Sequence, residues 1–154
     1  MKVLPTLEGG LCIIPESEAD WMELHLICTD AVRPSHLAES LADLMDVDSD
    51  WDEFVVPDLE ESFNSQCRFV AATIENARDH NEKAIFITPP QSEKWYGAIN
   101  QARLSLETRY KLDAVEADGD LEEATPEVRS AYFRNRFYLF LQSMLLEFVM
   151  DGVE

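Results

Sequence analysis

Four aspartates alternate along the acidic run DVDSDWDEF, residues 46–54, with the spacing of a calcium-binding loop: Asp46, Asp48, Asp50 and Asp52. They match positions one, three, five and seven of an EF-hand loop, where oxygen ligands coordinate Ca²⁺. The sixth position of such a loop requires glycine but is Trp51 here, and the twelfth requires a bidentate glutamate but is Pro57. The pattern therefore predicts a solvated acidic loop and no metal site, with loose divalent-ion binding as the alternative.

The three histidines, His25, His36 and His80, show no metal-binding or catalytic spacing. None belongs to an H-E-x-x-H motif, and the Glu-x-x-His repeats of a di-iron helix bundle are absent. The chain also lacks the G-x-S-x-G nucleophile motif and the glycine-rich phosphate loop with its lysine. The sequence therefore predicts no catalytic residue, no cofactor and no metal ligand, and we expect a non-enzymatic protein.

The three cysteines, Cys12, Cys28 and Cys67, lie far apart in the sequence and form no C-x-x-C pair. Such a sparse, odd-numbered set argues against a disulfide framework and against a structural zinc site. Cys28 and Cys67 fall on the apolar faces of expected helices. We therefore interpret the cysteines as small buried side chains.

The block WYGAINQARLSLETRYKL, which begins at Trp95, combines an amide and two arginines with apolar residues: Asn100, Arg103 and Arg109. Asn100 and Arg103 share one helix face, since they are three residues apart. Arg103 and Arg109 are out of register and do not form a single anion clamp. We interpret these side chains as a polar network that fixes this helix against the acidic part of the chain, with a binding site as the alternative.

The elements that position these residues are mainly helical. Glu8-Gly9-Gly10 separates two short apolar runs, 3–7 and 11–14, which predicts a β-hairpin. Apolar residues at helical spacing predict helices over 17–32, 34–45, 57–78, 92–110 and 126–150, with a strand over 84–88 and an acidic loop over 113–125. We expect one α+β domain over residues 1–154, mainly α, with about five helices and a two- or three-stranded sheet formed by the hairpin and strand 84–88.

Two segments of the chain resemble one another. CIIPESEADW (12–21) and FITPPQSEKW (86–95) each contain an apolar strand, a proline, Ser-Glu and a tryptophan. They predict two equivalent strand-to-helix units whose strands share a sheet, or else a coincidence, since Pro and Ser-Glu often start helices. The helix over 126–150 is apolar nearly all round, so it is either central in the core or lends one side to a partner.

The composition restricts the function. The 154 residues carry a net charge of −19, which repels the phosphates of nucleic acids and anionic lipids. No signal peptide or membrane-spanning run is apparent, so we expect a cytoplasmic protein. Residues 67–111 are slightly basic, and four of their arginines would serve a DNA-binding alternative: Arg68, Arg78, Arg103 and Arg109.

Three stretches resemble a known family: GGLCIIPESEADWMEL, the block that begins at Trp95, and FYLFLQSMLLEFV. The chain is similar here to the domain-of-unknown-function family named after the actinobacterial oxidative-stress regulator AosR. The matching positions are Gly9, Gly10, Trp95, Asn100, Arg103, Leu104, Leu106, Arg109, Leu141 and Gln142. The resemblance implies a non-enzymatic, stress-related regulator. It also implies redox control through closely spaced cysteines, a pair that this chain lacks unless folding brings Cys12 and Cys28 together.

We therefore expect a non-enzymatic protein-interaction or regulatory module that binds a protein partner or itself. Its expected contact surfaces are the free face of helix 126–150 and the basic stretch of helix 92–110. Its expected polar network consists of Asn100, Arg103, Arg109 and Gln142. Two alternatives remain at this point: a transcription regulator with redox-sensitive cysteines, and a small-molecule-binding protein or enzyme without a recognisable motif.

Overall fold

The computed structural model describes residues 1–31, 56–118 and 121–150. The helix predicted over 34–45, the acidic run 46–54 and His36 lie outside the described residues.

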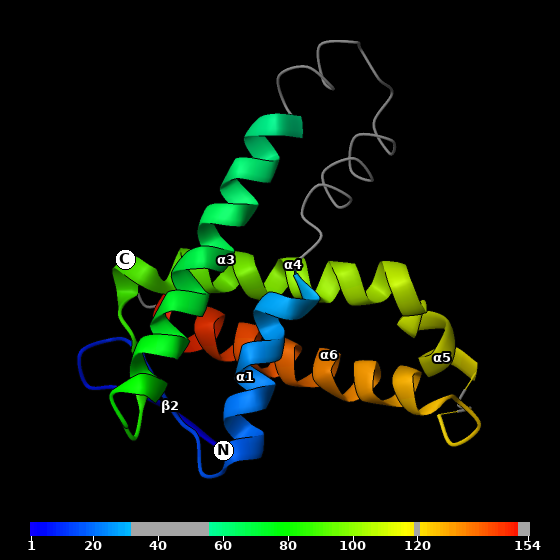
Figure 1. The fold of residues 1–154 in the computed structure, drawn as a ribbon, viewed down its shortest axis with the longest axis horizontal. Coiled ribbons are helices and arrows are strands. Elements are labelled where there is room, and N and C mark those ends of the chain that lie inside the picture. Colours follow the sequence, from blue (N-terminus) through cyan, green and yellow to red (C-terminus); the bar gives the residue numbers. More distant parts are fainter. Residues whose placement is uncertain (32–55, 119–120, 151–154) are drawn as a thin grey trace.

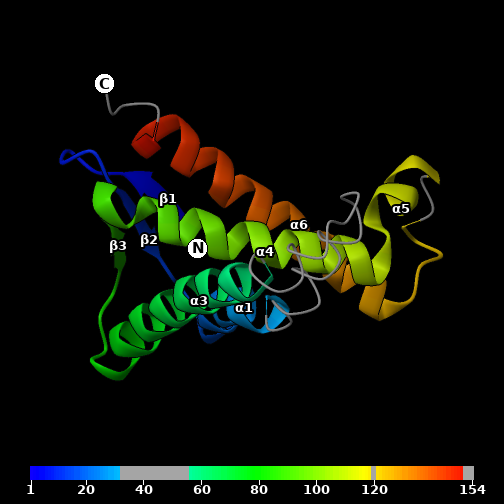
Figure 2. The ribbon, with the colours of Figure 1, turned by 90° about the horizontal axis from the view of Figure 1, so that it is seen from above.

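Helix α4 (Ser92–Tyr110) runs through the middle of the described fold. In Figures 1 and 2, α6 (Pro126–Leu145) lies along one side of α4, while α1 (Glu18–Asp30) and α3 (Val56–Asp79) lie on the other. Contacts of α4 with all three helices agree with this arrangement. A small sheet closes one end of the helices, and α5 (Leu112–Asp118) lies at the opposite end (Figure 2).

Three short antiparallel strands form the sheet, in the order β1 (Lys2–Pro5), β2 (Leu11–Ile14) and β3 (Ile85–Ile87). Cys12 of β2 pairs with Phe86 of β3. The turn between β1 and β2 requires glycine twice. Gly9 has a φ of +87°, and a Cβ at Gly10 would lie 2.4 Å from the backbone oxygen of Ile87.

Strands β2 and β3 each lead through proline into a helix, α1 and α4 respectively. Their antiparallel pairing confirms the expectation that the two similar segments place their strands in one sheet. At the start of α1 the Ser17 hydroxyl accepts a hydrogen bond from the Asp20 backbone N–H at 3.3 Å. Such a cap satisfies a backbone donor that has no partner within the helix.

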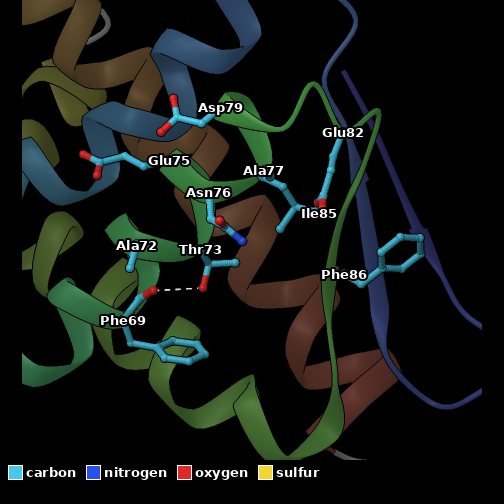
Figure 3. A pocket seen from close by; sticks show the side chains of 10 residues that line it. All are labelled: Phe69, Ala72, Thr73, Glu75, Asn76, Ala77, Asp79, Glu82, Ile85 and Phe86. Atoms are coloured by element: carbon cyan, nitrogen blue, oxygen red, sulfur yellow. Dashed lines mark hydrogen bonds between the residues drawn. The ribbon is translucent and has the colours of Figure 1, made fainter.

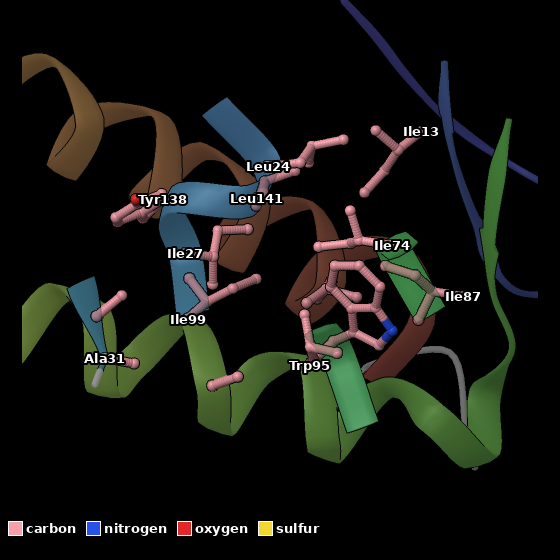
Figure 4. Close-up of a cluster of buried hydrophobic side chains, with 14 of the residues drawn as sticks. Ile13, Leu24, Ile27, Ala31, Ile74, Ile87, Trp95, Ile99, Tyr138 and Leu141 are labelled. Atoms are coloured by element: carbon pink, nitrogen blue, oxygen red, sulfur yellow. The ribbon is translucent and has the colours of Figure 1, made fainter. Parts of the chain in front are cut away.

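The core lies between the helices and the inner face of the sheet (Figure 4). Strand residues alternate as expected for a sheet with one buried face, since Leu11 and Ile13 are buried while Cys12 between them is partly exposed. Four side chains of α4 are fully buried, namely Trp95, Ile99, Ala102 and Leu106, while Tyr110 at its end is only partly buried. Burying a large apolar side chain contributes roughly 1.5–3 kcal/mol. Helix α4 buries three of them, Trp95, Ile99 and Leu106, and contacts α1, α3 and α6, so it is central to the core.

Helix α6 buries one side only. Its buried apolar residues are Ala131, Tyr138, Leu141 and Leu145, and Val149 continues this face into the π-helical turn Leu146–Met150. Large apolar side chains on its other side remain exposed. Within the described fold this helix is therefore not surrounded by the core on all sides.

The predicted loop over 113–125 is wrong in its first part, where α5 forms. Lys111 has a φ of +51° and ends α4, and Leu112 starts α5 immediately afterwards with a side chain only 2% exposed. Helix α5 has seven residues, and its one buried large apolar side chain is at the first position. It therefore shows no apolar periodicity, and its acidic composition is typical of a loop.

The predicted fold class is confirmed. The described residues form five helices and a three-stranded antiparallel sheet that combines the N-terminal hairpin with β3. Four of these helices were predicted, and α5 was not. No helix among the described residues is long and apolar enough to cross a lipid bilayer.

Candidate functional site

A buried carboxylate joins three helices. Asp30 is the last residue of α1 and is 4% exposed. The Tyr138 hydroxyl donates to its Oδ2 at 2.6 Å, and Arg134 donates through Nε to Oδ2 at 2.8 Å and through Nη2 to Oδ1 at 3.0 Å. Arg109 of α4 donates through Nη2 to Oδ1 at 3.3 Å. We call these four residues the Asp30 cluster.

Electrostatics explains the composition of the Asp30 cluster. A carboxylate at the C-terminus of a helix is unfavourable, because the backbone dipoles place partial negative charge there. The two guanidinium groups compensate that charge and the loss of hydration on burial. The hydrogen bond to Asp30 raises the pKa of Arg134, and burial, followed by the Asp30 charge, raises the pKa of Tyr138. The cluster therefore ties α1, α4 and α6 together through one buried carboxylate that pairs with two guanidinium groups.

A second polar cluster lies between α4 and α6 and consists mainly of amides. Arg103 donates through Nη1 to Oε1 of Gln142 and through Nε to Oδ1 of Asn135 at 3.4 Å. Gln142, which is 2% exposed, donates through Nε2 to Oδ1 of Asn100 at 3.3 Å. We call these four residues the Arg103 cluster. Among the described residues, the hydrogen bonds of Arg103 go to amide oxygens and not to a carboxylate.

The four residues expected in one polar network thus belong to two clusters. Asn100, Arg103 and Gln142 are linked to each other, whereas Arg109 contacts Asp30. The two arginines are separate in space, in agreement with their difference in helical register.

A hollow of about 420 Å³ lies beside the Arg103 cluster, between α6 and the end of α4 with the start of α5. We call it the α6 hollow. Its lining is Arg103, Leu112, Asp113, Tyr132, Asn135, Arg136, Leu139, Phe140 and Ser143. Arg103 and Asn135 belong both to the cluster and to the wall of the hollow, so their hydrogen bonds fix two polar groups at this surface. The hollow combines two cations with exposed apolar side chains.

Sequence reasoning missed three members of the Asp30 cluster. Asp30 lies three residues after the buried Ile27, on the inner side of α1, so an acid within an apolar stripe was the available signal. Arg134 and Tyr138 are four residues apart and so share a face of α6. Only the fold shows that this face meets the end of α1.

Folding places Cys28 beside Cys67. The Cys28 thiol donates to the Cys67 backbone oxygen at 3.6 Å, and the Cys67 thiol donates to Oε1 of Gln101 at 3.4 Å. Cys12 lies on the outer face of the sheet and is far from this contact in the fold, and all three thiols are free. The structure therefore offers no pairing of Cys12 with Cys28.

The environment of the thiols opposes thiolate chemistry. Burial raises the pKa of Cys28 to about 12 and the pKa of Cys67 to about 11, and it also raises the pKa of Cys12. Reactive cysteines have lowered pKa values, because the thiolate is the nucleophile. The sequence predicts small buried side chains at the three cysteines, whereas the structure shows all three as only partly buried.

The other candidates of the sequence analysis do not converge on a site. His25 and His80 are exposed, and Nδ1 of His80 lies 2.8 Å from the backbone oxygen of Asn76. Arg78 forms an ion pair with Glu18. In the described part of the chain, no three His, Cys, Asp or Glu side chains are grouped so that they could hold a metal ion.

Residues 31–149 match the model of a family described as a domain of unknown function, DUF2017. The chain belongs to the DUF2017 family. Comparison of this DUF2017 chain with curated proteins and with solved structures found no match. The matched residues contain both polar clusters except Asp30 itself, together with the whole α6 hollow. The family description assigns no activity, so the function of this DUF2017 protein must be inferred from the site.

Proposed function

We propose that this chain is a non-enzymatic interaction module and that the outer side of α6, with the α6 hollow, is its contact surface for a protein partner. The observation that carries the proposal is the position of Arg103. Its guanidinium group is held at the wall of the hollow by two amide oxygens, next to the exposed side chains of Leu139 and Phe140. A cation fixed in this way is oriented before a partner arrives, which lowers the entropy cost of binding.

Exposed apolar side chains extend the surface along α6 and the π-helical turn. Phe133 is 58% exposed and Phe140 is 47% exposed, and the two are seven residues apart. Leu139 and Leu146 repeat the same spacing with exposures of 46% and 40%. Single exposed apolar residues are common on protein surfaces. A series repeated every two helical turns is instead typical of a surface that receives another helix.

The charges of the hollow select the chemistry of the partner. Arg103 and Arg136 line it, with Asp113 as its single acidic residue. An amphipathic helix with acidic and apolar side chains fits this combination. A symmetric contact between two copies would instead place this surface against itself, so neither copy would supply the acidic side chains that complement it. We therefore propose a different protein as the partner.

The resemblance to the family named after AosR supports a regulatory, stress-related role for such a contact. The proposal does not include redox control, because the raised pKa values of Cys28 and Cys67 oppose it. DNA binding receives little support as well. Among the four arginines considered for it, Arg78 and Arg109 are paired with carboxylates, which reduces the charge available to phosphates.

The experiment starts with a photoreactive p-benzoylphenylalanine in place of Phe140, and at Met22 on α1 as the control position. Phe140 and Met22 are 47% and 49% exposed, so both sites are accessible. Proteins captured only from position 140 are purified, and their affinity for the intact chain is measured by calorimetry. Capture alone identifies candidates and does not support the proposal.

The affinity of the captured protein for variants decides the outcome. We expect Phe140→Ala and Arg103→Gln each to weaken binding at least about tenfold, as central apolar and arginine contacts do, and Met22→Ala to change it less than about twofold. Unchanged affinity for both hollow variants would contradict the proposal. A homodimer that Phe140→Ala dissociates, measured by light scattering, would show a second copy as the occupant and overturn the choice of a different protein.

A further inference from the structure

The free edge of strand β3 lies beside a groove. Because the strand order of the described residues is β1-β2-β3, β3 pairs with β2 on one side and, within this part of the chain, stands at the edge of the sheet on the other. Alternate residues of an edge strand direct their backbone N–H and C=O groups away from the sheet. The groove, of about 690 Å³, separates this strand from the second half of α3 (Figure 3). We call it the α3–β3 groove.

The groove has an apolar floor. Phe69, Ala72 and Ala77 of α3 line one side, and Ile85 of β3 lies opposite them (Figure 3). Phe86 also lines the groove and is 61% exposed. Natural edge strands are commonly protected by a charged residue or a proline that discourages pairing. The outward-facing residue of β3 is instead a large aromatic side chain.

A second, smaller hollow continues the surface along β3. It has a volume of about 270 Å³ and is lined by Phe86, Ile87 and Thr88 together with residues of the hairpin turn, among them Leu7. The two hollows share Phe86. The smaller one lies on the side of β3 that faces the hairpin, so it is the α3–β3 groove that borders the unpaired edge, where an added strand would lie.

Acidic residues border the α3–β3 groove. Glu82 projects towards Ile85 from the turn before β3, and Glu75 and Asp79 lie on the α3 side (Figure 3). The groove lies at the C-terminus of α3, where the backbone adds partial negative charge. Arg78 and Lys83 adjoin these acidic residues in the sequence, but neither lines the groove, and Arg78 is paired with Glu18. The end of the groove near Glu82 therefore favours a cation.

We propose that the edge of β3 accepts an extended peptide segment of a partner protein as a fourth strand, with apolar side chains in the α3–β3 groove and basic side chains near Glu82, Glu75 and Asp79. Main-chain hydrogen bonds supply affinity in such strand addition, and side-chain pockets supply specificity. The segment alternates valine-like and lysine- or arginine-like residues, since successive side chains of a strand point to opposite faces.

Charge excludes a second copy of this chain as the occupant. Pairing of two β3 edges would bring two sets of these three carboxylates together, on molecules that each carry a net charge of −19. Like charges across a strand pair are unfavourable. The surface is separate from the α6 hollow, so this inference stands or fails independently of the proposed function.

The test uses the intact chain and a fluorescein-labelled peptide, Lys-Val-Lys-Val-Lys-Val-Lys amide, with fluorescence anisotropy as the readout. The protein variant combines Glu75→Gln, Asp79→Asn and Glu82→Gln, all at exposed positions. The matched control combines Glu122→Gln, Glu123→Gln and Glu127→Gln, which are also exposed and change the net charge equally. We expect the groove variant to bind the peptide at least about tenfold more weakly and the control to differ less than about twofold.

A second peptide separates strand addition from general attraction between opposite charges. Proline in place of the central valine removes a backbone N–H but keeps every charge, and we expect it to weaken binding at least about tenfold. Equal binding of the valine and proline peptides would overturn the proposal, as would equal losses in the two protein variants. A concentration-dependent dimer that Phe86→Ala abolishes would also overturn it, because the edge would then be occupied by a second copy.

Discussion

The two polar clusters that involve α4 and α6 differ in whether their arginines are paired with a carboxylate. In the Asp30 cluster, two guanidinium groups and a phenol surround one buried carboxylate, so positive and negative charges meet inside the fold. In the Arg103 cluster, amide oxygens hold one guanidinium group, and the described residues bring no carboxylate to it. The Arg103 cluster borders the α6 hollow, with Arg103 and Asn135 in its wall.

This difference separates a structural role from a recognition role. The Asp30 cluster ties three helices together, because each of its two guanidinium groups pairs with the same buried carboxylate within the fold. A cation held by neutral groups keeps most of its electrostatic potential for an acidic partner. The comparison therefore predicts that changes in the Asp30 cluster affect mainly folding, whereas changes in the Arg103 cluster affect mainly binding.

The largest expected effect is that of Asp30→Asn. This substitution keeps the size of the side chain but removes the charge that compensates Arg134 and Arg109. Loss of one partner from a buried ion pair typically costs about 3–5 kcal/mol, and we expect about 3 kcal/mol because solvent reaches part of both arginines. Urea unfolding followed by circular dichroism measures the loss as a lower midpoint.

The control for this substitution is Asp113→Asn, at an exposed position in the wall of the α6 hollow. It removes the same charge from the surface and should change the free energy of unfolding by less than about 0.5 kcal/mol. If Asp30→Asn were as mild as this control, the Asp30 cluster would not have the structural role assigned to it.

The second prediction concerns alkaline pH, because only the Asp30 cluster contains a phenol. Burial and the Asp30 charge raise the pKa of Tyr138 above the ordinary value of 10.0. The folded state therefore holds the proton more tightly than the unfolded state, and its stabilisation is complete below about pH 10 and is lost as the pH rises further. For one group the free energy of unfolding falls by up to about 1.4 kcal/mol per pH unit.

Tyr138→Phe isolates this contribution. The thiols of Cys28 and Cys67, with pKa values raised to about 12 and about 11, add a similar loss that begins near pH 9 in both proteins. The difference between the unfolding curves of the two proteins should thus depend on pH only above about pH 10. A difference that stayed constant from pH 8 to pH 11 would show that Tyr138 does not titrate as described.

The same clusters show how far the sequence could be interpreted. Periodic apolar residues located α1, α3, α4 and α6 and the three strands, because burial imposes a regular pattern on each element. Asn100 and Arg103 could be grouped because they share a helix face, and Gln142 was added from the family resemblance. No local pattern showed that α6 packs against α4 at this point. Asp30, Arg134 and Arg109 lie far apart in the sequence, and no local pattern specifies contacts of that kind.

The smallest expected effect on folding is that of Gln142→Leu, which leaves Arg103 and Asn100 without their shared partner. Both groups are partly exposed and can hydrogen-bond to water instead, so the loss should be about 1 kcal/mol in urea unfolding. Arg103 then loses its fixed orientation at the α6 hollow. We therefore expect affinity for the partner to fall several-fold, through the entropy cost of ordering a free arginine, although the fold is nearly intact. A large loss of stability with unchanged affinity would contradict the binding role assigned to the Arg103 cluster, because Gln142 would then stabilise the fold and not the contact surface.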